Sequence, residues 1–203
     1  MKTERRPYRM QARATAAEGT RARILDAAIE SFLAGWYDEV TLRDVAAGAE
    51  VALQTVVNHF GTKEELFSAG VEALHERVEA ERGAATPGDL DGALSILVEH
   101  YEATGDAAIR ALAFEDRIPA MKPVLARGRQ SHRAWVERIF AATLAEFPAG
   151  AERRRVLAAH VAALDVYVWK LLRRDLGLGR AATIAVMRGL VTGLDQSQQR
   201  RTP

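Results

Sequence analysis

The sequence predicts an all-α protein in two parts. Apolar residues recur at helical spacing along most of the 203 residues, and no stretch alternates convincingly between apolar and polar side chains as a strand would. The chain is 48% hydrophobic, which argues against disorder and allows a sizeable core. Its clearest break is GAATPG, residues 83–88. We expect about nine helices: an N-terminal three-helix unit, a long linking helix and a C-terminal helical domain.

The composition restricts the function classes. No apolar run approaches the ~20 residues that a membrane helix needs, and the N-terminus lacks a signal-peptide core. The sequence contains no cysteine, so disulfides, thiolate metal sites and cysteine catalysis are excluded. We expect a soluble, cytoplasmic protein without contact to a membrane. The net charge of +1 is small, so any surface that binds a polyanion must be local.

The first 18 residues are locally basic. They show no sustained apolar period, and we interpret residues 1–19 as a flexible basic arm. Two interpretations remain open, a segment that lies along DNA phosphates or in the minor groove and a solvated tail. The charged residues of the arm are Lys2, Arg5, Arg6, Arg9 and Arg13, against Glu4 and Glu18.

A first helix is expected from Thr20 to about Ala34, where Gly35 would end it. The aromatic residues that follow, Trp36 and Tyr37, are expected to fill the small core of the N-terminal unit.

Two short helices joined by a tight bend are predicted between Thr41 and Phe60. Thr41 stands three residues before Asp44, a capping pair that would begin a helix from Leu42 to Ala49. In the second helix Val56 and Phe60 are spaced for one buried face. The outward positions are polar, and Asn and Gln can bond adenine while Thr and His can reach backbone oxygens. A helix-turn-helix whose second helix contacts DNA is therefore predicted, with the outward residues Gln54, Thr55, Asn58 and His59.

The segment from Thr20 to Phe67 resembles the TetR family of transcriptional regulators. It has, in order, ILDAA, a Gly-aromatic turn at residues 35–37, TLRDVA, NHF and TKEEL. Three positions depart from the family pattern: Glu50 stands where Gly is usual, Ala52 where a Ser cap is usual and Val57 where Tyr is usual. The resemblance implies a DNA-binding domain over residues 20–66. The expected DNA contacts are Thr41, Arg43, Leu53, Gln54, Thr55, Asn58, His59 and Lys63.

Thr62 and Glu65 form a second capping pair, which predicts a long helix from Lys63 to about Arg82. Beyond the break we expect one amphipathic helix from Leu90 to Tyr101 and a short one near residues 109–116. Pro119 and Pro123 would interrupt the chain before a third helix, residues 132–143. Two further helices are expected, residues 151–176 and 181–194, within a C-terminal domain that spans residues 67–198.

The last two helices favour a homodimer. The helix over residues 151–176 is apolar on both sides and must be covered on both sides. In the resembling family the last two helices form a four-helix bundle between subunits. The expected interface includes Leu172, Ala185, Gly189 and Gly193.

A mainly apolar pocket for a small effector of unknown identity is also expected in the C-terminal domain. Among the polar residues, Asp165 is the strongest candidate for a ligand contact, since it falls in the middle of an apolar helix face. If buried, its carboxylate would suit a cationic effector. Alternatively, Asp165 pairs across the dimer and the aromatic residues are plain core. The expected pocket residues are His100, Tyr101, Phe114, Met121, His132, Trp135, His160, Asp165, Tyr167 and Trp169.

An enzyme is a weaker hypothesis. Glu72 and His75 have the spacing of one half of a diiron helical-bundle motif, but the second half is missing. We find no nucleophile with a base and no glycine-rich phosphate loop, and we expect no catalytic residues, metal ligands or cofactor. The favoured hypothesis is a homodimeric repressor that binds operator DNA and is released by a small molecule. A helical small-molecule carrier that no longer binds DNA is the second hypothesis.

Overall fold

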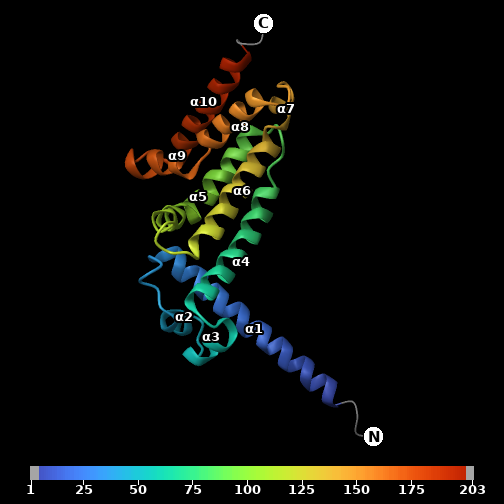
Figure 1. The fold of residues 1–203 in the computed structure, drawn as a ribbon, viewed down its shortest axis with the longest axis vertical. Coiled ribbons are helices and arrows are strands. Elements are labelled where there is room, and N and C mark those ends of the chain that lie inside the picture. Colours follow the sequence, from blue (N-terminus) through green and yellow to red (C-terminus); the bar gives the residue numbers. More distant parts are fainter. Residues whose placement is uncertain (1–4, 200–203) are drawn as a thin grey trace. The chain divides into compact units, whose positions relative to one another are not determined.

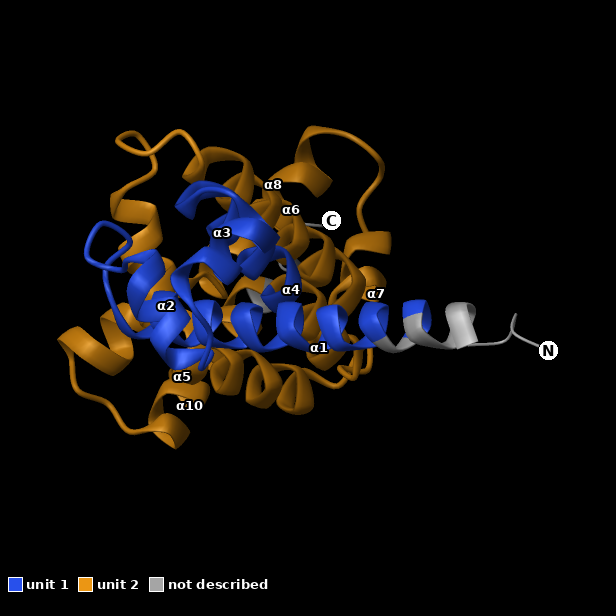
Figure 2. Cartoon of the chain, turned by 90° about the horizontal axis from the view of Figure 1, so that it is seen from below, with its two compact units in different colours: residues 1–74 blue, residues 75–203 orange. Residues whose placement is uncertain are grey.

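The computed structural model describes the backbone of residues 5–199 and the side chains of residues 10–194 except Ala12. All regular structure in residues 5–199 is helical, with ten α-helices and one π-helical turn, close to the number expected (Figure 1). The chain divides into two compact units, Met1–Leu74 and His75–Pro203 (Figure 2). Helix α4, Lys63–Gly83, belongs to both units along the chain.

Unit 1 contains α1 (Arg5–Ala34), α2 (Leu42–Gly48), α3 (Leu53–Phe60) and the first half of α4. Its core is a small cluster in which every helix takes part, and α1 and α3 each pack against α2. The fully buried members come from all four helices and fix the α2–α3 pair on α1 and α4. They are Ile24, Ala28, Val45, Val56 and Leu66.

Helix α1 begins fifteen residues earlier than the sequence suggested, at Arg5 instead of Thr20. The expected flexible arm is thus corrected: from Arg5 onward it is the first half of a 30-residue helix, while residues 1–4 lie outside the described residues. The physical reason is composition, since this stretch holds mostly Ala, Arg, Gln, Met and Glu, which are strong helix formers, and Pro7 falls in the first turn, where it is tolerated. Figure 1 shows this half continuing beyond the α2–α3 pair.

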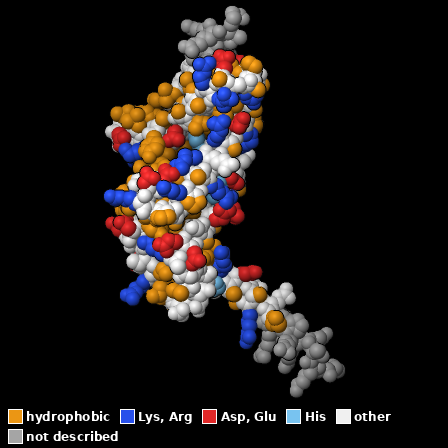
Figure 3. All heavy atoms as spheres, in the orientation of Figure 1, with side chains coloured by type: hydrophobic (Ala, Val, Ile, Leu, Met, Phe, Trp, Pro, Cys, Tyr) orange, Lys and Arg blue, Asp and Glu red, His pale blue; other side chains and the backbone are white. Residues whose placement is uncertain are grey.

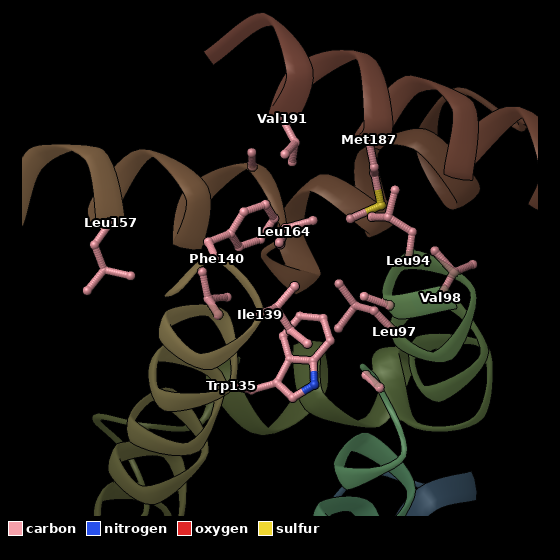
Figure 4. Close-up of a cluster of buried hydrophobic side chains, with 14 of the residues drawn as sticks. Leu94, Leu97, Val98, Trp135, Ile139, Phe140, Leu157, Leu164, Met187 and Val191 are labelled. Atoms are coloured by element: carbon pink, nitrogen blue, oxygen red, sulfur yellow. The ribbon is translucent and has the colours of Figure 1, made fainter. Parts of the chain in front are cut away.

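Unit 2 contains the rest of α4 and all later helices. They are α5 (Leu90–Ala113), α6 (Met121–Ile139), α7 (Ala141–Ala145), α8 (Ala151–Ala163), α9 (Val166–Lys170), the π-helical turn η1 (Leu171–Asp175) and α10 (Arg180–Gln199). Figure 4 shows how their side chains meet in one apolar core. Leu94, Leu97 and Val98 of α5 face Trp135 and Ile139 of α6, and Phe140, Leu157, Leu164, Met187 and Val191 complete the cluster.

Three helix boundaries in unit 2 differ from the prediction. The two helices expected over residues 90–116 form one continuous helix, α5. Pro123 does not interrupt the chain: it lies in the first turn of α6, where its missing N–H has no intrahelical partner to lose. The long helix expected over residues 151–176 breaks after Ala163, because Asp165 caps α9 by accepting a hydrogen bond from the Tyr167 N–H at 2.9 Å.

Gly105 of α5 lies directly against the indole ring of Trp169, which is fully buried. A Cβ at this position would overlap ring atoms of a side chain that cannot move away. We therefore expect Gly105→Ala to destabilise the protein by about 1–3 kcal/mol. Gly128 of α6 is a matched control with nothing near its would-be Cβ, so Gly128→Ala should stabilise by about 0.5–1 kcal/mol. Urea unfolding of both variants tests this, and equal shifts of the same sign would contradict the packing argument.

The carboxylate of Glu102 in α5 holds η1 and α9 in place. It accepts hydrogen bonds from Trp169 Nε1 at 3.0 Å and from Arg173 Nε at 2.6 Å. The hydrogen bonds from Arg173 lower the pKa of Glu102 from its ordinary 4.5 to about 2.

Because this pKa is lower in the folded state, the stabilisation is fully present above about pH 4.5 and is lost as the pH falls toward 2. We expect Glu102→Gln to cost about 2 kcal/mol at neutral pH, as for hydrogen bonds to a charged group. The gap in unfolding free energy between wild type and variant should shrink below pH 4.5. Denaturant titrations at several pH values measure it, with Glu99→Gln, an exposed partner of Arg180, as the control. A gap that is independent of pH would rule out this role.

Candidate nucleic-acid interface

Helix α2 is fixed at its start by the predicted capping box. Asp44 N–H donates to Thr41 Oγ1 at 3.2 Å, and Thr41 N–H donates to Asp44 Oδ2 at 3.0 Å. The Thr41 hydroxyl also donates to Asp44, and these hydrogen bonds lower the pKa of that carboxyl. Val45 and Ala46 bury the inner face, while Arg43 is exposed. The side chain of Thr41 is thus already engaged, whereas that of Arg43 faces solvent.

The bend between α2 and α3 requires a left-handed residue, and this chain places Glu50 there with φ 53°. The Glu50 and Val51 N–H groups donate to the carbonyls of Ala47 and Ala46, which closes the end of α2. A side chain in this conformation costs about 1–2 kcal/mol relative to Gly. The departure noted in the sequence is therefore a strained position in an otherwise regular turn.

We expect Glu50→Gly to stabilise unit 1 by about 1 kcal/mol, because Gly adopts positive φ without a steric penalty. The substitution also removes one negative charge beside α3, so DNA affinity should rise. Thermal unfolding and fluorescence anisotropy with DNA check the two effects. Glu39→Gly is a suitable control, since it removes an exposed acid of unit 1 that is not at positive φ; an equal gain in stability there would contradict the strain argument.

Helix α3 presents one buried and one exposed face. Val56 is fully buried and Phe60 nearly so. Ala52 at the N-cap makes no side-chain cap hydrogen bond, as its residue type requires. On the outer face Gln54 Nε2 donates to Asn58 Oδ1 at 2.9 Å, so the two amides are held side by side. Thr55 and His59 are partly exposed beside them.

The exposed face of α3 also carries two apolar side chains. Leu53 is 40% exposed and Val57 is 37% exposed. Apolar groups can contact the methyl group of thymine in the major groove. Val57, which the sequence comparison marked only as the loss of a usual Tyr, thus lies where it can contact a base.

The start of α4 carries the second capping box: Thr62 N–H donates to Glu65 Oε2 at 2.8 Å, and Glu65 N–H donates to Thr62 Oγ1 at 3.2 Å. Lys63 lies in this first turn, with its Nζ 4.4 Å from the ring centroid of Tyr37 and 3.4 Å from the Asp38 carbonyl oxygen. Its ammonium group therefore lies at the N-terminus of α4, where backbone N–H groups without intrahelical acceptors can bind an anion.

The two aromatic residues after α1 behave differently. Tyr37 packs between Phe32 and Phe67 as expected, and burial together with Glu64 raises its pKa to about 12. Trp36 was expected in the same core, but it is 41% exposed. The turn can direct only one of two adjacent side chains inward, so this expectation was wrong for Trp36.

The residues expected to line an effector pocket separate into two groups. His100 lies beside Tyr101 on α5 and His132 beside Trp135 on α6, with ring centroids 5.5 Å and 6.4 Å apart. Tyr101 and Trp135 belong to the same buried cluster. Met121, His160 and Trp169 are buried, and Phe114 is the C-cap of α5.

Two of the expected pocket residues lie elsewhere. Tyr167 is 55% exposed on the outside of α9, and Asp165 is a partly exposed N-cap instead of a buried carboxylate. The sequence argument for Asp165 assumed a continuous helix. Since the helix breaks there, the carboxylate has a structural partner in the Tyr167 N–H.

An apolar surface covers the outside of α9, η1 and α10. Figure 3 shows hydrophobic side chains gathered there. Next to them, the expected small-residue row of Ala185, Gly189 and Gly193 is exposed, and the two glycines have nothing near a would-be Cβ. Leu172 is the exception among the expected interface residues: it is 6% exposed and packs in the core of its own subunit, so that assignment was wrong. We call the exposed set the apolar face: Tyr167, Leu171, Leu176, Val186 and Leu190.

Among the described residues no group of three or more His, Asp or Glu could hold a metal ion. The sequence pair Glu72 and His75 is not part of such a group, and His75 Nε2 lies 3.0 Å from Glu79 Oε1. Within the same part of the chain, no helix is long and apolar enough to cross a membrane.

Comparisons with known proteins agree with this geometry. Residues 24–69 match the sequence profile described as "Bacterial regulatory proteins, tetR family". No curated protein matches the sequence.

Several solved structures share the fold over most of both chains. A protein described as a transcriptional regulator from Pseudomonas aeruginosa PAO1 is 17% identical, with a TM-score of 0.68 over 92% of this chain and 95% of its own. A TetR-family regulator from a Rhodococcus species is 18% identical, with a TM-score of 0.66 over 87% and 99%. The multidrug binding protein EbrR, complexed with imidazole, is 26% identical, with a TM-score of 0.56 over 84% and 88%. Residues 24–69 therefore belong to the TetR family of bacterial regulatory proteins, and the chain as a whole has the fold of that family's transcriptional regulators.

Proposed function

We propose that this protein is a cytoplasmic homodimeric repressor that binds operator DNA through α3 and releases it when a small molecule binds unit 2. The observation that carries the proposal is the outer face of α3. It presents a linked Gln54–Asn58 amide pair and the apolar Val57. Helix α3 is held by its buried residues Val56 and Phe60, and the helices before and after it, α2 and α4, each begin at a capping box. Amides can bond adenine and apolar groups can contact thymine methyls, so this face suits a sequence rich in A·T pairs.

The expected DNA contacts then divide by role. Gln54, Asn58 and Leu53 would contact base edges, since they project from the exposed face of α3. Val57, which was not among the expected contacts, projects from the same face and would join them. The remaining expected residues would contact phosphates and set the position of α3 in the groove. They are Arg43, Thr55, His59 and Lys63, with Thr41 acting mainly through its cap on α2.

Electrostatics assign a further role to the first half of α1. Between Thr20 and Leu66 eight acidic residues oppose four basic ones, so the DNA-contacting domain has a net charge of −4. Phosphate neutralisation supplies most non-specific affinity. The five basic residues of the first 18 positions must then provide a large share of it.

The apolar face supports a dimer. Exposed apolar patches of this kind in a soluble fold mark interaction surfaces, and the small residues of α10 allow another helix to approach closely. In a dimer with a two-fold axis through this face, both subunits would contribute the same patch to the interface. Two copies of α3 would then meet successive major grooves.

Effector release would act through α4. This helix begins at Lys63 beside the DNA-contacting residues and ends at Gly83 in unit 2. A ligand that favours one arrangement of α4 would change the separation of the two α3 helices. A coupling free energy of about 1–3 kcal/mol is enough for such a switch. EbrR, which shares the fold, is described as binding multiple drugs, and this supports a ligand site in unit 2.

The experiment is a binding assay with the DNA upstream of the protein's own gene. We expect salt-dependent, sequence-specific binding by fluorescence anisotropy, with weaker binding to scrambled DNA of equal length. Asn58→Ala should reduce the preference for the specific sequence more than the total affinity. If the full-length protein showed no sequence preference against a fragmented genomic library, Glu50, Ala52 and Val57 would instead mark a ligand-binding protein that has lost operator binding.

A further inference from the structure

Unit 2 contains a buried cation that forms no ion pair with any of the described residues. Arg82, in the last turn of α4, is 6% exposed, and its Nε is buried without a hydrogen-bond partner. The guanidinium lies over the rings of Tyr101 and Trp135, 5.7 Å from each centroid. None of the ion pairs found among the described residues includes Arg82. Burial of a charge without an opposite charge is unfavourable, so this arrangement is incomplete as it stands.

The polar atoms around Arg82 include a second unpartnered group. His132 of α6 is 8% exposed, and its Nε2 lies 3.3 Å from the Val161 carbonyl oxygen. A carbonyl can only accept, so Nε2 carries the hydrogen and Nδ1 presents a lone pair in the neutral ring. Nδ1 is buried without a partner. It is therefore free to accept one hydrogen bond from an O–H or N–H group.

The two histidines of this region add no positive charge to that of Arg82, and the second cation nearby, Arg138, donates to the backbone carbonyls of Arg82 and Ala85. Burial, followed by Arg82, lowers the pKa of His132. The same two causes, with His132 and His75 adding to them, lower the pKa of His100 to about 3. Both imidazoles are thus neutral at physiological pH.

The carboxylate of Asp165 does not neutralise the charge of Arg82. Asp165 influences Tyr101 and His132 electrostatically, but its carboxylate accepts from the Tyr167 N–H and forms no ion pair with Arg82. The Tyr101 hydroxyl is also engaged, since it donates to the Leu164 carbonyl at 3.0 Å. Burial raises the pKa of this hydroxyl, and a hydrogen bond with the Arg82 side chain acts to lower that pKa without supplying a negative charge. The unmet requirements are one negative charge and one hydrogen-bond donor.

We propose that Arg82 and His132 bind a small organic acid carrying one negative charge, with its apolar part against Tyr101 and Trp135. This inference rests on the proposed function, because it names the chemical class of the effector. The carboxylate would pair with the guanidinium of Arg82, which is suited to planar oxyanions. A hydroxyl or amide N–H of the ligand would donate to His132 Nδ1. A cationic effector, which a buried Asp165 would have favoured, is opposed by the positive charge of Arg82.

Thermal unfolding of the full-length protein in matched pairs of compounds tests the proposal. The probes are lactate, mandelate, 4-hydroxybenzoate and 3-hydroxyoctanoate, which each combine one carboxylate with a hydroxyl donor. Each is compared with its neutral amide, with benzylamine as a cation and sodium chloride to equalise ionic strength. At least one acid should raise the melting temperature by several degrees more than its amide, while benzylamine should not. Arg82→Met should abolish that difference. Arg133→Met, which replaces an exposed arginine of the neighbouring helix α6, should leave it unchanged.

A second measurement does not depend on the choice of probe. Without any added acid, Arg82→Met should melt at the same or a higher temperature than the wild type, since it replaces an unpaired buried charge with an apolar chain of similar length. A large fall in melting temperature would show that the charge is already compensated and would overturn the proposal. It would also be overturned if no acid exceeded its amide or if benzylamine stabilised equally. DNA binding without probes is measured separately, so failure here leaves the proposed regulator function standing.

Discussion

Replacement of Leu190 by glutamate should convert the protein from a dimer to a monomer. Leu190 is 44% exposed in the apolar face of α10, next to the exposed Gly189. In a two-fold interface the substitution would bring two unpaired carboxylates into a desolvated contact, at a cost of about 3–5 kcal/mol for each uncompensated charge. The helical content should remain, because Leu190 lies outside the core of its own subunit. Light scattering at micromolar concentration would measure the mass, and circular dichroism the fold.

Ala126→Glu is the matched control, since it adds the same charge at an exposed position of α6 outside the apolar face. It should remain a dimer. The monomeric Leu190 variant should also lose most of its affinity for an operator with two half-sites, because each monomer then binds its half-site independently of the other. A wild-type protein that is monomeric at micromolar concentration, or a Leu190 variant that stays dimeric, would show that the apolar face is not the interface.

Deletion of Met1–Glu18 should weaken DNA binding strongly and flatten its salt dependence. The deleted segment holds five of the basic residues available to a domain whose net charge is otherwise −4. Each lost phosphate contact reduces the slope of log K against log salt by about 0.9, so the slope should become shallower by up to about 4. The packed part of α1 begins at Ile24, beyond the deletion, so unit 1 should still fold.

A full-length variant in which Lys2, Arg5, Arg6, Arg9 and Arg13 are all replaced by glutamine separates charge from helix length. It keeps good helix formers along α1 and should reproduce the deletion. Gln54→Ala serves as the contrasting change, because it should reduce sequence preference while the salt slope stays nearly constant. Equal affinity and equal slope for the truncated and intact proteins would make the first half of α1 irrelevant to DNA.

The parts of this fold that local sequence signals determine were predictable. The capping pairs at Thr41 and Thr62 form as expected, and Ala52 leaves α3 without a side-chain cap. Capping depends on residues three positions apart, so the sequence contains the whole interaction. The buried face of α3 follows from its spacing in the same way.

The features that depend on distant contacts were not predictable. Leu172 and Tyr167 have similar apolar surroundings in the sequence, yet one is in the core and the other is exposed, because the break at Asp165 changes which side faces inward. Nothing in the sequence around Arg82, beyond its place near the end of a helix, indicates that this side chain is buried. Its significance comes from burial against Tyr101 and Trp135, which are 19 and 53 residues further along the chain.

Hydroxyl-radical footprinting of the full-length protein on the DNA upstream of its own gene tests the central claim most directly. A two-fold dimer that places two α3 helices in successive major grooves should protect two half-sites of related, inverted sequence about 34 Å apart, one turn of the DNA helix. The same footprint should vanish for Leu190→Glu at equal protein concentration. A single protected half-site, or uniform protection without sequence preference, would contradict the account of a dimeric operator-binding regulator.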